Sequence, residues 1–378
     1  MRHLSADMHR GQRASMGNQT VHATKAGYKK AADFSATQYE FFLLPGRHPY
    51  KTTMKQVLMR LLVSIGIAAL TAGAGAVHAQ DYPTRPVQLV IPYTAGGATD
   101  VLARIVAENL TTRLGQRVVP ENRPGAGAVL ATGQVARAPA DGYTLLFGTL
   151  AHALNATMNP KLPFDPVNDF EFVGKIGQLS FIVVTHPSLK VNDLQGLVEV
   201  MRKDPGKLQF ASAGIGSPMH LGGEMLKHLT KTDAVHVPYK GESAALTDLI
   251  GGHVNFMLCS VTTCAPRLAD GTIKPLSLTA AARSPVVPGL PTGAEAGFPG
   301  TETYSWFFIA APKGTPAAVV SRLDRAINDM LADEKFRQRA QGMGIDIDAR
   351  STPAGTKQLV QAEIDRWRPI IKAIGLTN

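Results

Sequence analysis

From about residue 81 onward, short apolar runs alternate with amphipathic stretches, and this alternation restricts the possible folds more than any other feature. Val87–Ile91 has the length and composition of a buried strand. Ala98–Leu114 carries apolar residues on one face of a helix, and Gly115 is expected to end that helix. Strands that alternate with helices predict βαβ units, and therefore an α/β protein with mainly parallel sheets.

The same alternation continues to the end of the chain. A length of 378 residues exceeds that of one average domain and suits two. Further strands are predicted at 118–119, 143–147, 181–185, 208–211, 234–237, 254–258 and 303–309. Further helices are predicted up to residue 138 and at 194–202, 219–229, 242–250, 316–331, 334–342 and 356–374.

The net charge of +10 would fit a nucleic-acid-binding protein if it were spread over the folded part of the chain. It is not, because residues 1–80 hold ten Lys and Arg against three Asp and Glu. The remainder carries 29 basic and 26 acidic residues, and no dense basic block with interleaved aromatics occurs there. The composition therefore excludes nucleic acid as a partner.

Residues 54–79 have the organisation of a Sec-type signal peptide. Lys55 and Arg60 precede an apolar run at 61–70, and Val77 and Ala79 occupy the two positions that a signal peptidase reads. We expect an exported protein that begins at Gln80, with an uncleaved anchor as the alternative. Residues 1–53 are interpreted as a non-native extension from a start codon placed too early, with a genuine extension as the alternative.

The two cysteines, Cys259 and Cys264, can be interpreted once export is expected. An oxidising compartment permits a bridge between them, but their spacing leaves bridged and free forms equally open. No cysteine lies near the cleavage point, so a lipid anchor is not expected. Two cysteines without close histidine partners also provide no zinc site.

The first candidate site is the junction between the strand at 87–91 and the helix that follows. Glycines ahead of a helix let backbone N–H groups approach a ligand, and the partial positive charge of the helix N-terminus favours an anion. The alternative is a tight turn without a ligand, in which Asp100 serves the first helical turn. The expected ligand-binding residues here are Tyr93, Thr94, Ala95, Gly96 and Gly97.

A second junction of the same kind follows the strand at 208–211. Ser217 before Pro218 has the pattern of a helix N-cap and first helical residue, and Ser217 can cap the helix, bind a ligand or do both. His220 in the first turn is expected to be solvated or capping rather than a ligand contact. The expected ligand-binding residues here are Ala213, Gly214, Gly216 and Ser217.

Other polar residues at strand ends complete the expected site. Thr149, His152 and Asn155 follow a strand and can donate hydrogen bonds into a cleft, or they can be ordinary loop residues. Tyr239 and Ser260 also stand at strand ends, where ligands of open α/β sheets gather.

Catalytic motifs are absent from the sequence. Neither Gly-x-Ser-x-Gly nor His-Glu-x-x-His occurs, and no P-loop or dinucleotide fingerprint follows the glycines at 96–97. We therefore expect no enzyme activity, no cofactor and no metal. A triad assembled only in space stays open as an alternative.

Taken together, several short segments of this sequence resemble those of the Bug family, the periplasmic binding proteins of tripartite tricarboxylate transporters. Each matching segment is short, but they follow one another in order across the chain beyond the signal peptide. The matching segments lie at 92–100, 122–127, 140–146, 214–221, 235–241, 288–292 and 311–316.

The resemblance implies a two-lobed periplasmic-binding-protein fold of the type II-like, Venus-flytrap kind, whose chain crosses between lobes twice. Lobe 1 would comprise 80–182 and 307–378, and lobe 2 would comprise 183–306. Relatives hold small carboxylates, and residues 94–97 and 213–217 match the two facing carboxylate loops. Asn255 departs from the family pattern, in which Asp is frequent, and so do the two cysteines.

The function implied is capture of a small carboxylate, such as a dicarboxylate, for a tripartite tricarboxylate-type uptake system. The protein would be periplasmic, monomeric and in transient contact with the membrane subunits of the transporter. A ligand sensor that feeds a receptor kinase is the first alternative, and an exported hydrolase is the second.

Overall fold

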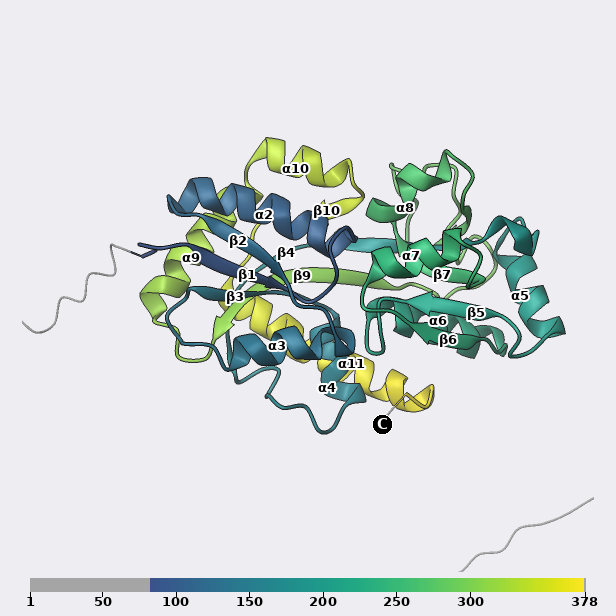
Figure 1. The fold of residues 1–378 in the computed structure, drawn as a ribbon, viewed down its shortest axis with the longest axis horizontal. Helices are drawn as coiled ribbons and strands as arrows, with labels where there is room; N and C mark the ends of the chain where they lie inside the picture. Colours follow the sequence, from purple (N-terminus) through teal and green to yellow (C-terminus); the bar gives the residue numbers. More distant parts are fainter. Residues whose placement is uncertain (1–81, 377–378) are drawn as a thin grey trace, which may run out of the picture. The chain divides into compact units, whose positions relative to one another are not determined.

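The structure is a computed structural model that describes residues 82–376 (Figure 1). The predicted signal peptide and upstream extension lie outside the described residues. Within those residues, paired strands follow the order β2-β1-β3-β9-β4-β7-β5-β6, and β8 and β10 also pair with β4. The strands are β1 (Val87–Ile91), β2 (Val118–Asn122), β3 (Thr144–Thr149), β4 (Phe170–Thr185), β5 (Gln209–Ser212), β6 (Val235–Pro238), β7 (Phe256–Ser260), β8 (Lys274–Leu278), β9 (Tyr304–Pro312) and β10 (Ile345–Ile347).

Strand β4 belongs to both lobes of the protein. Its residues 170–180 pair with β9 in the first sheet, and residues 181–185 pair with β7 in the second. The first lobe is built on β1, β2, β3, β9, β10 and the start of β4, and the second on β5 to β8 and the end of β4. The chain leaves the first lobe within β4 and returns at β9, which confirms the predicted two-lobed α/β fold with two crossings. The lobe boundaries at 182/183 and 306/307 stay a prediction.

The expectation of mainly parallel sheets was wrong, because both sheets are mixed. The β1–β2, β1–β3, β5–β6 and β5–β7 pairs are parallel, whereas every pair made by β4 or β9 is antiparallel. The physical reason is the connection between the lobes. Strand β4 carries the chain from the first lobe to the second and β9 carries it back, so the two run in opposite directions and pair antiparallel.

Helices cover both faces of the first sheet. In Figure 1, α2, α9 and α10 lie on one face and α3, α4 and α11 on the other. Alternate residues of β1 divide between the two hydrophobic cores that result, with Leu89 and Ile91 in one and Val90 in the other. The helices of this lobe are α2 (Ala98–Leu114), α3 (Val129–Ala136), α4 (Ala151–Met158), α9 (Ala317–Leu331), α10 (Glu334–Gln341) and α11 (Pro353–Ala373), with a short 3-10 turn, η1 (Ala126–Ala128), before α3.

The second lobe repeats the pattern on a smaller sheet, with helices around β5, β6 and β7 (Figure 1). These helices are α5 (Leu194–Lys203), α6 (Pro218–Thr230), α7 (Glu242–Ile250) and α8 (Val261–Leu268). Between β4 and α5 lies the 3-10 turn η2 (Pro187–Leu189). None of the helices in residues 82–376 is both long enough and apolar enough to cross a membrane.

The sequence located some elements well and missed others. The predicted bounds of β1, α2 and α7 are those observed. Gly115 ends α2 as predicted, and the structure shows it in a left-handed conformation. The first part of β4 was missed because Gly174 and Gly177 interrupt its apolar pattern. A Cβ at Gly177 would lie 2.3 Å from the carbonyl oxygen of Asp346 in β10, so this glycine allows β10 to pair. Helices α4 and α8 and strands β8 and β10 were also missed.

Candidate functional site

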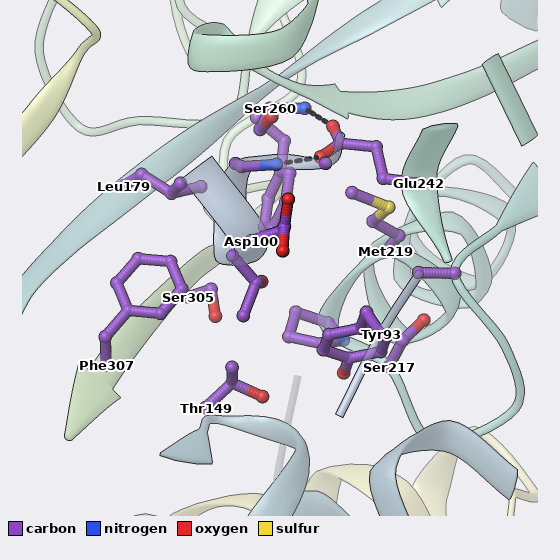
Figure 2. Close-up of a pocket in the computed structure, with 16 residues that line it drawn as sticks. Tyr93, Asp100, Thr149, Leu179, Ser217, Met219, Glu242, Ser260, Ser305 and Phe307 are labelled. Carbon is purple, nitrogen blue, oxygen red and sulfur yellow. Dashed lines mark hydrogen bonds between the residues drawn. The ribbon is translucent and has the colours of Figure 1, made fainter. Parts of the chain in front are cut away.

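A cavity lies where the two lobes meet, beyond the carboxyl ends of β1, β3, β5 and β7 (Figure 2). Ligands of open α/β sheets gather at this edge. The space between atoms, including the side open to solvent, is about 430 Å³. The lining residues are Tyr93, Gly97, Ala98, Thr99, Asp100, Thr149, Leu179, Phe181, Ala213, Ser217, Pro218, Met219, Glu242, Ser260, Ser305 and Phe307.

The N-terminus of α2 forms one wall of this cavity. Gly97 is the N-cap residue and no side chain of its own caps the helix. The first bond into the helix runs from Val101 N to Gly97 O, at 3.0 Å, so the N–H groups of the three residues between them lie outside the helical ladder. Such groups, together with the helix dipole, favour an anion.

Thr94, Ala95 and Gly96 were expected to bind ligand, but the structure places them against α7 instead of in the cavity. The Ser243 hydroxyl donates to Ala95 O at 2.7 Å and lies 3.3 Å from Thr94 Oγ1. Gly96 N donates to Asp100 Oδ2 at 3.0 Å. Thr94 and Ala95 thus contact the second lobe through Ser243, and the role of all three residues as ligand contacts stays a prediction.

Asp100 serves the first turn of α2, as the sequence suggested. Its buried carboxylate accepts hydrogen bonds from Gly96 N, the Arg104 guanidinium and Asn122 Nδ2. Burial alone would raise the pKa of this carboxyl, but the hydrogen bonds outweigh it and hold the pKa below its ordinary value. The negative charge is thus neutralised locally by Arg104, at 2.9 Å.

Tyr93 lies in the cavity wall with its side chain 7% exposed. Its hydroxyl is buried and has no hydrogen-bond partner among the described residues. Burial raises the pKa of Tyr93 to about 12 against the opposing effect of the neighbouring Thr149 side chain, so the phenol keeps its proton and can donate it to a hydrogen bond. A buried donor without a partner is costly, and a ligand acceptor in the cavity would remove that cost.

The N-terminus of α6 faces the cavity from the second lobe. Ser217 is the N-cap, as predicted, and its hydroxyl accepts a hydrogen bond from His220 N at 3.2 Å. Leu221 N donates to Ser217 O in the first hydrogen bond of the helix, so the N–H of Met219 has no acceptor within the helix. Ser217, Met219 and the expected Ala213 all line the cavity.

Two stacked histidines support the loop before α6. The rings of His220 and His236 lie 4.1 Å apart. Gly216 N donates to His220 Nδ1 at 3.4 Å, and His236 Nε2 lies 2.6 Å from Ser212 Oγ, which accepts from Gly214 N. Burial lowers the pKa of His220 to about 4, so the imidazole is neutral near pH 7 and can accept that bond.

Glu242, which sequence reasoning missed, reaches the cavity from the first residue of α7. Its carboxylate accepts from Ala98 N at 3.1 Å and from Ser260 N at 2.6 Å (Figure 2). It also accepts from the Thr263 hydroxyl at 3.0 Å. Ser260, an expected site residue, caps α8 and hydrogen-bonds Thr263 at 2.9 Å. The signal that could have identified Glu242 is its place just past the end of β6, near the predicted Tyr239.

A disulfide bond closes the turn whose residues bind Glu242. Cys259 and Cys264 are joined, with Cα atoms 6.0 Å apart, and both are fully buried. The bridged form, left open by the sequence, is the one the structure contains. Ser260 and Thr263, which bind Glu242, lie between the two cysteines.

Of the three polar residues expected after β3, only Thr149 lines the cavity. His152 lies on α4 among phenylalanines, with Phe170 and Phe308 rings at 5.1 and 5.4 Å, and its Nε2 contacts Pro166 O at 2.6 Å. An unpredicted helix turns this side chain into the core and away from the cavity, and its role as a ligand donor stays a prediction.

Asn155 is buried outside the cavity and serves the packing of the lobes. Its Nδ2 donates to Gly127 O and Ala151 O, both at 2.8 Å. A Cβ at Gly216 would lie 2.4 Å from Asn155 Oδ1, and Gly216 has a φ of +82°, so only glycine fits there. Neither Asn155 nor Gly216 lines the cavity, and the expectation that they contact ligand stays a prediction.

Gly214 and Tyr239 line a second cavity beside the first. Tyr93 and Ala213 border both cavities, and the opposite wall is formed by residues 125–128. The Tyr239 hydroxyl donates to Asp248 Oδ2 at 2.6 Å. These two predicted residues lie near the candidate site but do not line the cavity that α2 and α6 face.

The first cavity has one carboxylate in its lining, that of Glu242, without a cation partner, since Asp100 is paired with Arg104. Its lining includes Asp100 and Glu242 but neither lysine nor arginine. Residues 82–376 also contain no group of three His, Cys, Asp or Glu side chains arranged to hold a metal ion. An anion in this cavity would be bound by backbone N–H groups and hydroxyls.

Comparison with protein families decides the identity of this chain. The model of the tripartite tricarboxylate transporter family receptor matches residues 102–376. The chain belongs to this receptor family. Members of the family are solute-binding receptors, and the resemblance found in the sequence is confirmed.

Individual relatives agree with this assignment. Protein BugT of Bordetella pertussis is 35% identical over 321 residues, which are 84% of this chain and 98% of BugT. The solved periplasmic binding protein BugD is 34% identical, with a TM-score of 0.76, over 78% of this chain and 99% of BugD.

Two similar structures contain organic acids. An R. palustris protein with adipate is 37% identical, with a TM-score of 0.75, over 78% of this chain and 99% of that protein. MatC from Rhodopseudomonas palustris, with bound malate, is 33% identical, with a TM-score of 0.74, over 77% of this chain and all of MatC.

Proposed function

We propose that this receptor captures a small organic acid in the periplasm and delivers it to the membrane subunits of a tripartite tricarboxylate-type transporter, without catalysing a reaction. The observation that carries the proposal is the cavity between the lobes. Two helix N-termini, from α2 and α6, open into it, and the buried Tyr93 hydroxyl there has no partner. Backbone N–H groups and a phenol are donors suited to a carboxylate.

Closure of the lobes around the ligand is part of this function. The cavity is walled by both lobes, so a ligand that contacts Tyr93 of the first lobe and Ser217 of the second favours the closed arrangement. The acids in the two R. palustris structures support a carboxylate as the ligand class. The partner contacts would be transient and the receptor monomeric.

A thermal-shift screen of small mono-, di- and tricarboxylates tests the proposal. A ligand at 100 times its dissociation constant stabilises the protein by about 2.7 kcal/mol, which is a shift of several degrees for a chain of this size. Ser217→Ala should weaken binding and cost roughly 1 kcal/mol of helix-cap stability. Gly97→Val should abolish the shift, since a Cβ at Gly97 already approaches Glu242 Cβ to 3.3 Å.

The absence of any shift with a folded protein would refute the proposal, as would unchanged affinity in Gly97→Val. Deleting the gene for the membrane subunits and measuring uptake of the bound acid separates transport from sensing. Turnover of ester or amide substrates would instead favour the hydrolase alternative.

A further inference from the structure

The first N–H group of α2 already donates to a carboxylate from the protein itself. Glu242 belongs to α7 in the second lobe and is 5% exposed, yet its Oε2 accepts from Ala98 N of the first lobe at 3.1 Å. Its remaining bonds come from Ser260 N and Thr263. A carboxylate of the protein therefore already stands at the α2 end of the cavity (Figure 2).

The charge on Glu242 is not balanced by a cation. The ion pairs among residues 82–376 include Asp100 with Arg104 but none with Glu242, whose three partners are uncharged N–H and O–H groups. A second carboxylate placed at this end of the cavity would meet a like charge. Like charges repel strongly in a site of low dielectric.

The other end of the cavity keeps its anion position open. The N-terminus of α6, with Ser217 and Met219, borders the cavity, and the partnerless hydroxyl of Tyr93 lies in its wall. The surfaces between the two ends are largely apolar. In Figure 2, Leu179 and Phe307 lie on the side of the cavity opposite Met219. Such walls suit a hydrocarbon body.

We propose that Glu242 acts as a built-in second carboxylate, so that the cavity selects a monocarboxylate with an apolar body over the dicarboxylate of the same length. This inference rests on the proposed function and narrows its ligand class. The monocarboxylate proposed here also differs from the dicarboxylate that the family resemblance implies, because that expectation did not include Glu242.

The test compares length-matched acids by isothermal titration calorimetry at pH 7.5, using hexanoate with adipate and butanoate with succinate. Three proteins are compared: the wild type, Glu242→Gln and Glu199→Gln. Glu242→Gln removes the charge at similar size, and its amide can no longer accept from Ala98 N and Ser260 N together. Glu199 is exposed on α5, so Glu199→Gln makes the same charge change away from the cavity.

The wild type should bind the monocarboxylate of each pair at least tenfold more tightly than the dicarboxylate. Glu242→Gln should lower that ratio at least tenfold, whereas Glu199→Gln should leave it unchanged. Equal or tighter binding of the dicarboxylates by the wild type would overturn the inference and leave the proposed function standing. That comparison needs no variant, so it holds even if Glu242→Gln fails to fold. If the folded wild type binds no acid of any class, both proposals fail.

Discussion

Replacing Tyr93 with phenylalanine should stabilise the empty protein while weakening ligand binding. The ring stays in place, and only a hydroxyl that is buried and without a partner is removed. Such a group costs about 1–3 kcal/mol, and because this cavity has a side open to solvent we take the lower value, about 1 kcal/mol. The expected gain in melting temperature is then on the order of 2 °C.

Tyr82→Phe provides the matched control with the opposite sign. The Tyr82 hydroxyl donates to Gly142 O at 2.6 Å, so removing it loses a made hydrogen bond. We expect the free energy of unfolding of this variant to fall by about 1 kcal/mol, with unchanged ligand affinity. Tyr93→Phe, in contrast, should bind its carboxylate roughly tenfold or more weakly, since a bond to a charged acceptor contributes about 1.5–3 kcal/mol.

Urea denaturation of the ligand-free proteins at 25 °C, followed by calorimetric titration, measures both effects. The reasoning on Tyr93 would be refuted if Tyr93→Phe were destabilised as much as Tyr82→Phe, because its hydroxyl would then have a partner. Unchanged ligand affinity in Tyr93→Phe would show that the hydroxyl does not face the bound ligand.

Further predictions concern acid stability, the disulfide and processing. Burial lowers the pKa of His152 to about 4, so between pH 6.5 and 4 this imidazole is protonated in the unfolded chain but neutral in the folded chain. Stability is therefore complete above pH 6.5 and falls as the pH drops; His152→Phe should flatten the fall by up to about 1.4 kcal/mol per pH unit in urea titrations at pH 6 and 5. Replacing both Cys259 and Cys264 with serine should cost roughly 2 kcal/mol and weaken ligand binding, since the turn that holds Glu242 loses its constraint; labelling of the denatured, unreduced wild type should find no free thiol. Intact mass of periplasmic material should show a chain that begins at Gln80, and a species that keeps residues 1–53 would contradict this.

Local features carried most of the correct predictions about the fold. The helix from Ala98 to Leu114 was located because its apolar face, its preceding glycine and its terminal Gly115 are all local signals. Ser217 was recognised as an N-cap for the same reason, since a cap and the N–H group it accepts from are three residues apart. Helix α4 was missed because its eight residues are mostly buried, which removes the polar face that marks a surface helix.

The site residues divide along the same line. Gly97, Ser217 and Thr149 were identified because each stands at a strand or helix end, and the structure places each at the cavity. His152 and Asn155 stand at comparable positions in the sequence, but helical geometry turns them into the interior. The direction in which a side chain points depends on its element, and a missed element therefore misplaces every residue on it.

The sequence by itself determined the family, the two-lobed α/β class and the two junctions that border the cavity, because these depend on short motifs and on hydrophobic periodicity. Only the tertiary structure decided what occupies those junctions. Glu242 and Ala98 are 144 positions apart, and no local pattern indicates that the carboxylate of one accepts a hydrogen bond from the N–H of the other. That contact places the Glu242 carboxylate at the cavity. It forms only in the folded protein, because the packing of the two lobes brings together groups that are far apart in the sequence.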